Sequence, residues 1–140
     1  MIYMDSSLLL EIYLGQNRAA AAQEILGADE AKVASWLLAV EVPVVLRWAW
    51  RGARSGEASL ARALALFDED LRGTTLYDGL PEVARRVRTD GRLSLCRASD
   101  AVHVATALLL REEAGHPMLV ATFDDRMAKV ARAVGLPTAP

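Results

Sequence analysis

Short apolar runs alternate with stretches of helical periodicity along the chain of 140 residues. The short runs are apolar or β-branched and have the character of strands; they cover residues 2–4, 33–35, 74–77 and 118–121. The helical stretches lie between and after them, at residues 8–14, 17–26, 36–51, 55–73, 80–90, 100–114 and 125–134. This alternation predicts an α/β fold, a three-layer α/β/α sandwich around a central, mainly parallel sheet.

Polar residues mark where several of these helices begin. The Asp-Ser-Ser segment at residues 5–7 is a good cap for the first helix, Asn17 for the second, and Ser99 for the helix that starts at Asp100. Pro43 lies inside the apolar stretch 36–51, where a proline removes an amide donor. We therefore expect that helix either to be kinked at Pro43 or to begin there.

Composition limits the class of protein. A chain with 53% hydrophobic and 24% charged residues is typical of one folded domain, here residues 1–140. The single cysteine, Cys96, has no partner within the chain, which favours a reducing cytoplasm. No apolar run approaches the roughly 18 residues of a membrane span, and the N-terminus lacks the basic segment of a secretory signal. The net charge of −2 differs from the strongly basic balance of many nucleic-acid-binding domains.

Four carboxylates stand in apolar surroundings, unlike most acids of the chain. Asp5 directly follows a predicted strand, and Asp124 follows the segment Val120–Phe123 at the exit of another. Glu41 interrupts an apolar run, and Asp100 opens an apolar helix. A buried carboxylate is unfavourable unless it is paired, hydrogen-bonded or bound to a metal. Taken singly, each has a simpler explanation. Asp5 and Asp100 can be charges at helix N-termini, Asp124 can be a helix cap, and Glu41 can pair with Arg47.

One shared site explains these acids together. In parallel sheets, ligands bind beyond the carboxyl ends of the strands, where Asp5 and Asp124 are expected. Four such acids, in a chain with only two histidines, suit a hard cation such as Mg²⁺ or Mn²⁺. The ion would offset the repulsion between the acids and lower the pKa of a bound water beside a phosphodiester. The hydroxyl groups of Ser6, Ser7 and Thr122 are placed to orient a carboxylate or that water.

The same segments resemble the PIN domain family, and within it the VapC-type toxins. Four segments carry the resemblance and follow one another in the family's order: Ile2–Ser7, Ala39–Val42, Arg97–Ala107 and Thr122–Arg126. The most specific parts are the motif Asp-Ala-x-His-x-Ala-Thr-Ala, which starts at Asp100, and the motif Thr-x-Asp before the last helix. The resemblance spans nearly the whole chain.

The resemblance implies an Mg²⁺- or Mn²⁺-dependent endoribonuclease that is the toxin of a type II toxin–antitoxin pair. It places four acids in the catalytic metal site and gives Thr122 and Asp125 supporting roles; the four are Asp5, Glu41, Asp100 and Asp124. It also implies a structured RNA substrate, a homodimer, and a small antitoxin whose C-terminal segment reaches the active-site groove. A water activated by the metal would leave 5′-phosphate and 3′-hydroxyl ends.

Three tryptophans and a proline depart from the usual pattern of the family. For the tryptophans we expect packing in the core or in a dimer interface, with stacking on RNA bases as the alternative; they are Trp36, Trp48 and Trp50. Pro43 lies two residues after Glu41, so a break in the helix at Pro43 would change the direction in which the Glu41 carboxylate points.

Further residues near the predicted site have two explanations. Three arginines recur at helical spacing and can hold RNA phosphates or an acidic antitoxin segment, or can form an ordinary solvated face; they are Arg47, Arg51 and Arg54. His103 lies three residues after Asp100, on a similar helix face. We expect His103 to pack beside the site and leave it out of the catalytic set.

Two other functions remain as alternatives to a nuclease. A phosphatase or receiver-like domain also places acids at the ends of parallel strands, but it needs a lysine near the last strands, and Lys129 lies inside a predicted helix. The second alternative is a non-catalytic PIN-like binding module that docks an antitoxin or RNA. Binding of Mn²⁺ distinguishes this module from the enzyme.

Overall fold

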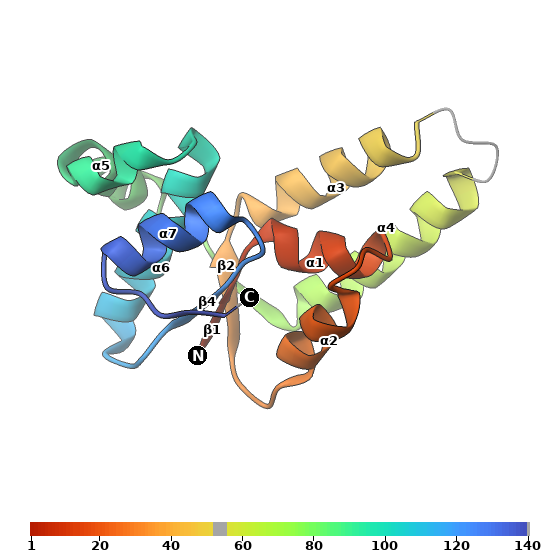
Figure 1. The fold of residues 1–140 in the computed structure, drawn as a ribbon, viewed down its shortest axis with the longest axis horizontal. Helices are drawn as coiled ribbons and strands as arrows, with labels where there is room; N and C mark the ends of the chain where they lie inside the picture. The colour runs from red at the N-terminus through yellow and green to blue at the C-terminus, as the bar shows by residue number, and fades with distance from the viewer. Residues whose placement is uncertain (52–55, 140) are drawn as a thin grey trace.

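The computed structural model describes residues 1–51 and 56–139 and contains a five-stranded sheet with the order β3-β2-β1-β4-β5 (Figure 1). All its strand pairs are parallel. The strands are β1 (Ile2–Met4), β2 (Lys32–Ser35), β3 (Thr74–Tyr77), β4 (Leu119–Ala121) and β5 (Thr138–Ala139). The predicted α/β fold with a parallel sheet is confirmed. The edge strand β5 was not predicted, because its two residues, which follow Pro137, are too few to show an alternation of apolar and polar residues.

Helices flank the sheet on both faces (Figure 1). One layer contains α1 (Ser6–Tyr13), α2 (Ala19–Gly27), α3 (Leu38–Ala49) and α4 (Gly56–Arg72). The other layer contains α5 (Leu80–Thr89), the 3₁₀ helix η1 (Gly91–Leu95), α6 (Ala98–Ala114) and α7 (Asp125–Ala133). In the described part of the chain, no helix is long and apolar enough to cross a membrane.

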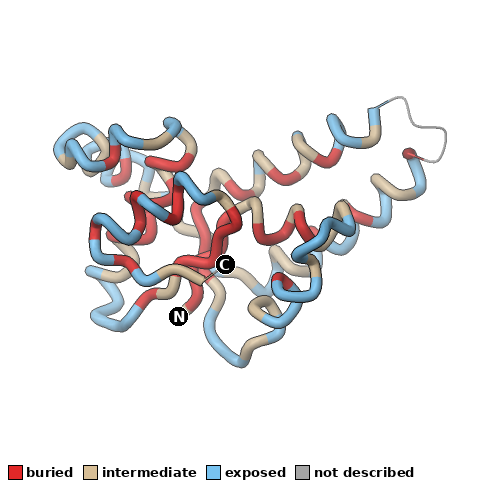
Figure 2. Tube along the Cα trace, in the orientation of Figure 1, coloured by how far each residue is buried: buried red, intermediate tan, exposed pale blue. Residues whose placement is uncertain are grey.

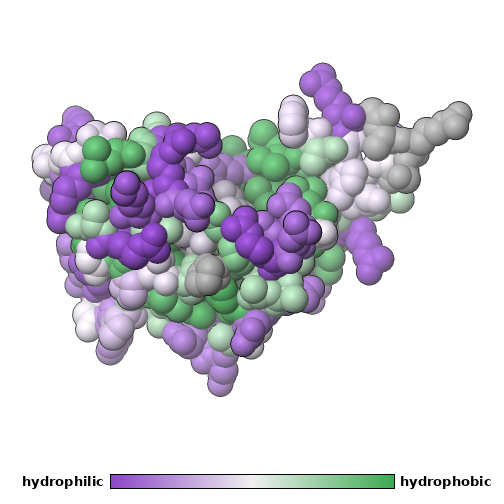
Figure 3. Space-filling model, in the orientation of Figure 1, coloured by the Kyte–Doolittle hydropathy of each residue, from purple (hydrophilic) through white to green (hydrophobic). Residues whose placement is uncertain are grey.

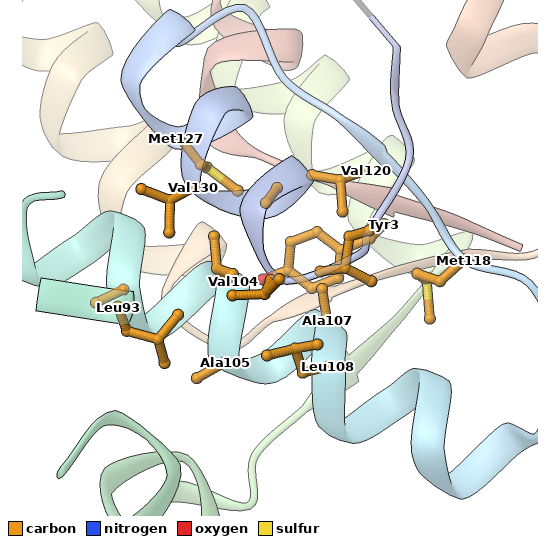
Figure 4. Close-up of a cluster of buried hydrophobic side chains, with 14 of the residues drawn as sticks. Tyr3, Leu93, Val104, Ala105, Ala107, Leu108, Met118, Val120, Met127 and Val130 are labelled. Atoms are coloured by element: carbon orange, nitrogen blue, oxygen red, sulfur yellow. The ribbon is translucent and has the colours of Figure 1, made fainter. Parts of the chain in front are cut away.

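Alternation along the central strands assigns each side chain to one of the two layers. Tyr3, Val33 and Val120 belong to the core cluster formed with α6 and α7, which Figure 4 shows in part. Their neighbours Met4 and Ala121 are packed in the clusters on the opposite face. The middle of the sheet is therefore buried on both sides (Figure 2), as period-two alternation in a covered parallel sheet requires.

Two predicted helix starts are wrong, and one of the two alternatives for a third helix is excluded. Asn17 does not cap the second helix: α2 begins at Ala19 after Arg18, and no side chain caps it. Ser99 does not cap the long helix but lies within α6, which begins one residue earlier. The apolar helix around Pro43 does not begin at that residue, since α3 starts at Leu38. The other alternative, a kink at Pro43, stays a prediction. The predicted start at Ser55 lies outside the described residues.

The helix α3 runs through Pro43 because its buried face stabilises it. Leu38, Val42 and Leu46 recur every four residues and are fully buried in the cluster shared with α4. Most helical stability in proteins comes from such packing, which here outweighs the amide hydrogen bond that Pro43 cannot donate. The helices α3 and α4 lie antiparallel and project from the body as an arm (Figure 1).

Candidate metal centre

The candidate site lies where β1 and β4 end, in the middle of the sheet. From β1 the chain moves outward through β2 to β3 on one side, and β4 and β5 lie on the other side. Asp5 follows β1 directly and Thr122 follows β4, so the two residues come from adjacent strands. Such a switch in strand order is where open parallel sheets bind their ligands.

The carboxylate of Asp5 is buried and held by hydroxyl groups. Its Oδ2 accepts hydrogen bonds from Ser7 Oγ at 2.5 Å and from Thr122 Oγ1 at 2.8 Å. The amide of Ser7 also donates to this oxygen at 3.3 Å, which makes Asp5 the cap of α1. Ser7 Oγ in turn accepts from the amide of Phe123 at 2.8 Å. These bonds fix the carboxylate so that its other oxygen, Oδ1, faces His103 Nε2 at 3.8 Å.

Glu41 meets the same histidine from the opposite layer. It lies in the first turn of α3, and its Oε2 is 2.9 Å from His103 Nε2. The other ring nitrogen, Nδ1, is 2.8 Å from Tyr3 Oη, and the imidazole is only 1% exposed. Among the described residues, the salt bridge of Glu41 is therefore with His103 and not with Arg47.

The pKa shifts of this pair reflect their mutual attraction. Burial alone would raise the pKa of Glu41, but hydrogen bonds from His103, Ser6 and Ser99 outweigh it and lower that pKa. Burial alone would lower the pKa of His103, but the hydrogen bond to Glu41 and the charges of Asp5, Glu41 and Asp100 raise it. Glu41 is thus held as a carboxylate, with Ser6 beside it.

Asp100 lies in the first turn of α6 and is repelled by the charges of two other aspartates. Its Oδ2 accepts from the amide of Arg97 at 3.1 Å, and its Oδ1 accepts from Ser99 Oγ at 3.3 Å. Burial and then the negative charges of Asp124 and Asp5 raise the pKa of Asp100 above its usual value. Asp100 therefore lies close enough to both Asp5 and Asp124 for their charges to repel its own.

Asp124 and Asp125 follow Thr122 but differ in surroundings. Asp124 caps α7, since its Oδ1 accepts from the amides of Arg126 at 2.8 Å and Met127 at 2.9 Å. Its own amide donates to Thr122 Oγ1 at 3.1 Å. Asp125 is exposed and, with Thr122, lines a neighbouring cavity of about 310 Å³.

The structure brings three potential ligands into one group. Single donor atoms of Asp5, Glu41 and His103 all lie within 4.8 Å of one another. Asp100 lies outside this group but interacts with Asp5 and His103 through its charge, and Asp124 in turn interacts with Asp100. Sequence reasoning left His103 out of the catalytic set. Its position three residues after Asp100 on a helix was the signal, because that spacing places both on one face.

A divalent cation fits this donor set. Two carboxylates and an imidazole supply ligand atoms, and two further aspartates add negative charge nearby. Oxygen-rich, multiply charged sites of this kind bind Mg²⁺ or Mn²⁺. The hydroxyl groups of Ser7 and Thr122 meanwhile orient Asp5, as residues around metal ligands commonly do.

Comparison with known proteins identifies the fold and the family of the chain. The chain is similar to a solved structure described as "Crystal structure of PAE2754 from Pyrobaculum aerophilum", with a TM-score of 0.60 and 19% sequence identity. That similarity covers 98% of this chain and 89% of the other, and shows the shared fold. The comparison with curated proteins gives no match. The family model described as "PIN domain" matches residues 2–133, nearly the whole chain, and the protein therefore belongs to the PIN domain family.

Proposed function

We propose that the protein is an endoribonuclease that depends on Mg²⁺ or Mn²⁺ and acts as the toxin of a type II toxin–antitoxin pair. PIN domains are typically metal-dependent nucleases, and this chain carries the acidic cluster that such activity requires. The observation that carries the proposal is the group of Asp5, Glu41 and His103 within 4.8 Å at the carboxyl end of the sheet. RNA as the substrate follows from the resemblance to VapC-type toxins.

Each acid has a role in the proposed reaction. Asp5, Glu41, Asp100 and Asp124 would hold the metal. When bound, the metal would supply Lewis acidity, which activates a water and neutralises charge on the phosphate. Thr122 keeps Asp5 in one orientation through its 2.8 Å hydrogen bond.

Supporting residues surround these acids. The hydroxyl group of Ser6 helps to lower the pKa of Glu41, which favours the charged carboxylate. Asp125 is exposed beside Thr122, where it would meet the RNA outside the buried site. These groups orient the acids and the substrate, and the proposed hydrolysis needs no covalent intermediate with the protein.

A groove beside α1 supports an antitoxin partner. A cavity of about 440 Å³ lies between α1 and α4, and Ile12, Leu14, Trp50 and Leu66 line part of it. Leu66 is exposed there although it is large and apolar. Amphipathic helices bind grooves of this kind through their apolar faces. We propose that a helical segment of the antitoxin docks in this groove.

An apolar stripe on α3 supports a homodimer. Val40, Val44 and Trp48 recur every four residues and are 48%, 60% and 75% exposed. Apolar atoms gather over α3 on the face that Figure 3 shows. Exposed stripes of large apolar residues are typical of interfaces between proteins. We propose that a second copy of the chain covers this stripe, so that Trp48 packs in an interface while Trp50 packs in the core cluster between α3 and α4.

Two arginines in and just after α3 have no assigned partner in this proposal. Arg47 and Arg51 are exposed, which suits either RNA phosphates or an ordinary solvated face. Arg54, the third residue of the predicted stripe, lies outside the described residues.

Cleavage of RNA by the purified, antitoxin-free protein tests the proposed function. We expect discrete fragments with Mg²⁺ or Mn²⁺ present, and none with EDTA. The variant Asp100→Asn should lose cleavage and keep its fold, because its side chain can still accept the hydrogen bond from Arg97. Asp29 is exposed, and Asp29→Asn is therefore a matched control that should cleave normally. Equal cleavage by the wild type and Asp100→Asn would contradict the proposal.

A further inference from the structure

His103 is the one imidazole that the structure places among the acids of the site. It projects from α6, one helical turn after Asp100. Its Nε2 lies 2.9 Å from Glu41 Oε2 and 3.8 Å from Asp5 Oδ1. The chain's other histidine, His116, is exposed in the loop before β4. One nitrogen ligand is therefore available where two carboxylates converge.

The separations between these atoms match those of ligands around one ion. An octahedral ion with bonds of about 2.1 Å separates neighbouring ligand atoms by about 3.0 Å and opposite ones by about 4.2 Å. The distance from His103 Nε2 to Glu41 Oε2, 2.9 Å, is close to the separation of neighbouring ligand atoms. The distance from Nε2 to Asp5 Oδ1, 3.8 Å, lies between the two separations. A metal held by both carboxylates at these positions would also lie within bonding reach of Nε2.

The hydrogen bonds behind the ring orient the imidazole for this role. Tyr3 Oη accepts from the amide of Ser35 at 3.2 Å. Tyr3 Oη also lies 2.8 Å from His103 Nδ1 and keeps a lone pair that can accept a hydrogen bond from it. Histidines that bind metals typically donate their other ring N–H to an oxygen in this way.

We propose that His103 Nε2 is a direct ligand of the bound ion, together with Asp5 and Glu41, and that it makes the site favour Mn²⁺ over Mg²⁺. This inference rests on the proposed metal-dependent function. Nδ1 lies against Tyr3 Oη, and Nε2 faces the carboxylates of Asp5 and Glu41. Mg²⁺ binds oxygen ligands and rarely takes an imidazole, whereas transition-metal ions accept nitrogen readily.

Pulsed electron paramagnetic resonance of Mn²⁺ bound to the whole protein tests the proposal directly. The electron spin echo envelope modulation of bound Mn²⁺ should contain ¹⁴N coupling from a coordinated imidazole. Growth with ¹⁵N-labelled histidine should replace this pattern with that of ¹⁵N. The variant His116→Gln should keep the coupling, and His103→Gln should lose it. Because the first two measurements use wild-type protein, they do not depend on whether the variant folds.

Metal affinities provide a second readout that does not use activity. Calorimetry should show that His103→Gln binds Mn²⁺ roughly 10–100-fold more weakly, a loss of the size seen when residues around a metal are changed. Its affinity for Mg²⁺ should change less, so that the preference for Mn²⁺ falls. Thermal unfolding of the same variant verifies that it is folded.

The outcomes separate this inference from the proposed function. Bound Mn²⁺ without histidine coupling, in a protein that still cleaves RNA, overturns the ligand role of His103 and leaves the nuclease intact. A coupling that stays ¹⁴N after labelling comes from another nitrogen and also overturns it. Absence of both Mn²⁺ binding and cleavage overturns the two proposals together.

Discussion

Thr122 and Asp5 are 117 residues apart in the chain, yet Thr122 Oγ1 donates a 2.8 Å hydrogen bond to Asp5 Oδ2. The bond joins the ends of the adjacent strands β1 and β4. Thr122 is 2% exposed, so water does not compete for the carboxylate. This contact and the bonds from Ser7 hold Oδ2 of Asp5, so that its other oxygen, Oδ1, faces His103.

Replacement of Thr122 by valine should therefore weaken metal binding. The variant Thr122→Val keeps the shape of the side chain and removes the donor, so Asp5 retains only its bonds to Ser7. We expect Mn²⁺ affinity to fall about 10–100-fold, as for other residues that orient metal ligands. Calorimetric titration measures this change. Thr75 is exposed on β3, and Thr75→Val should leave affinity unchanged; equal affinities in the two variants would contradict the assigned role.

A second prediction concerns the ion pair of Arg18 and the buried Glu11. Arg18 Nη2 donates to Glu11 Oε1 at 2.6 Å, and Nη1 donates to the carbonyl of Phe123 at 3.3 Å. The guanidinium also lies 4.3 Å from the centre of the Phe123 ring, so it joins α1 to the loop after β4. Arg18→Met should lower the free energy of unfolding by about 1.5–3 kcal/mol, because hydrogen bonds to a buried charge are lost.

Urea denaturation measures this loss. Arg88 is exposed on α5, and Arg88→Met is a matched control that should change the free energy of unfolding by no more than about 0.5 kcal/mol. If Arg18→Met were as stable as the control, the contacts of Arg18 would contribute nothing to the fold.

The third prediction is a loss of stability at alkaline pH. Tyr13 Oη donates to Asp70 Oδ2 at 2.5 Å and links α1 to α4. Burial, followed by this hydrogen bond and the charge of Asp70, raises the pKa of Tyr13 well above its usual value of 10.0. The raised pKa applies to the folded state only. The protonated Tyr13 side chain therefore contributes its full stabilisation below about pH 10. This contribution is lost as the pH rises through the folded-state pKa of Tyr13.

Denaturation at stepped pH tests this prediction. Above pH 10 the free energy of unfolding should fall with a slope approaching about 1.36 kcal/mol per pH unit for each such tyrosine. The free energy of unfolding of the variant Tyr13→Phe should fall less steeply with pH. Phenolate absorbance of the folded protein provides a separate measurement, and ionisation of Tyr13 at its usual pKa would contradict the burial argument.

A fourth prediction tests the apolar stripe on α3. Val44 is 60% exposed, so Val44→Glu places a charge in the proposed dimer interface without disturbing the core. We expect the dimer dissociation constant to rise at least about tenfold, or about 1.4 kcal/mol. Sedimentation measures it. Leu80 is another exposed apolar residue, on α5, and Leu80→Glu should leave self-association unchanged; a dimer that tolerates Val44→Glu would place the interface elsewhere.

Local patterns predicted the elements that are long or strongly apolar. The strands β1, β2, β3 and β4 were all expected within two residues of their observed bounds, because buried parallel strands have short apolar runs. The start of α2 and the strand β5 could not be predicted in this way. Arg18 precedes α2 because its side chain is held by Glu11, and β5 exists because it pairs with β4.

Part of the candidate site could be predicted from the sequence, and part depends on how the elements pack. The sequence by itself determined that Asp5 and Asp124 follow strands, since strand ends are marked by where the apolar runs stop. Only the tertiary structure decided that Glu41 and His103 meet, 62 residues apart, and that Tyr3 holds the ring from behind. The physical reason is that periodicity reports which face of an element is apolar, whereas contacts between elements depend on how those faces pack in three dimensions.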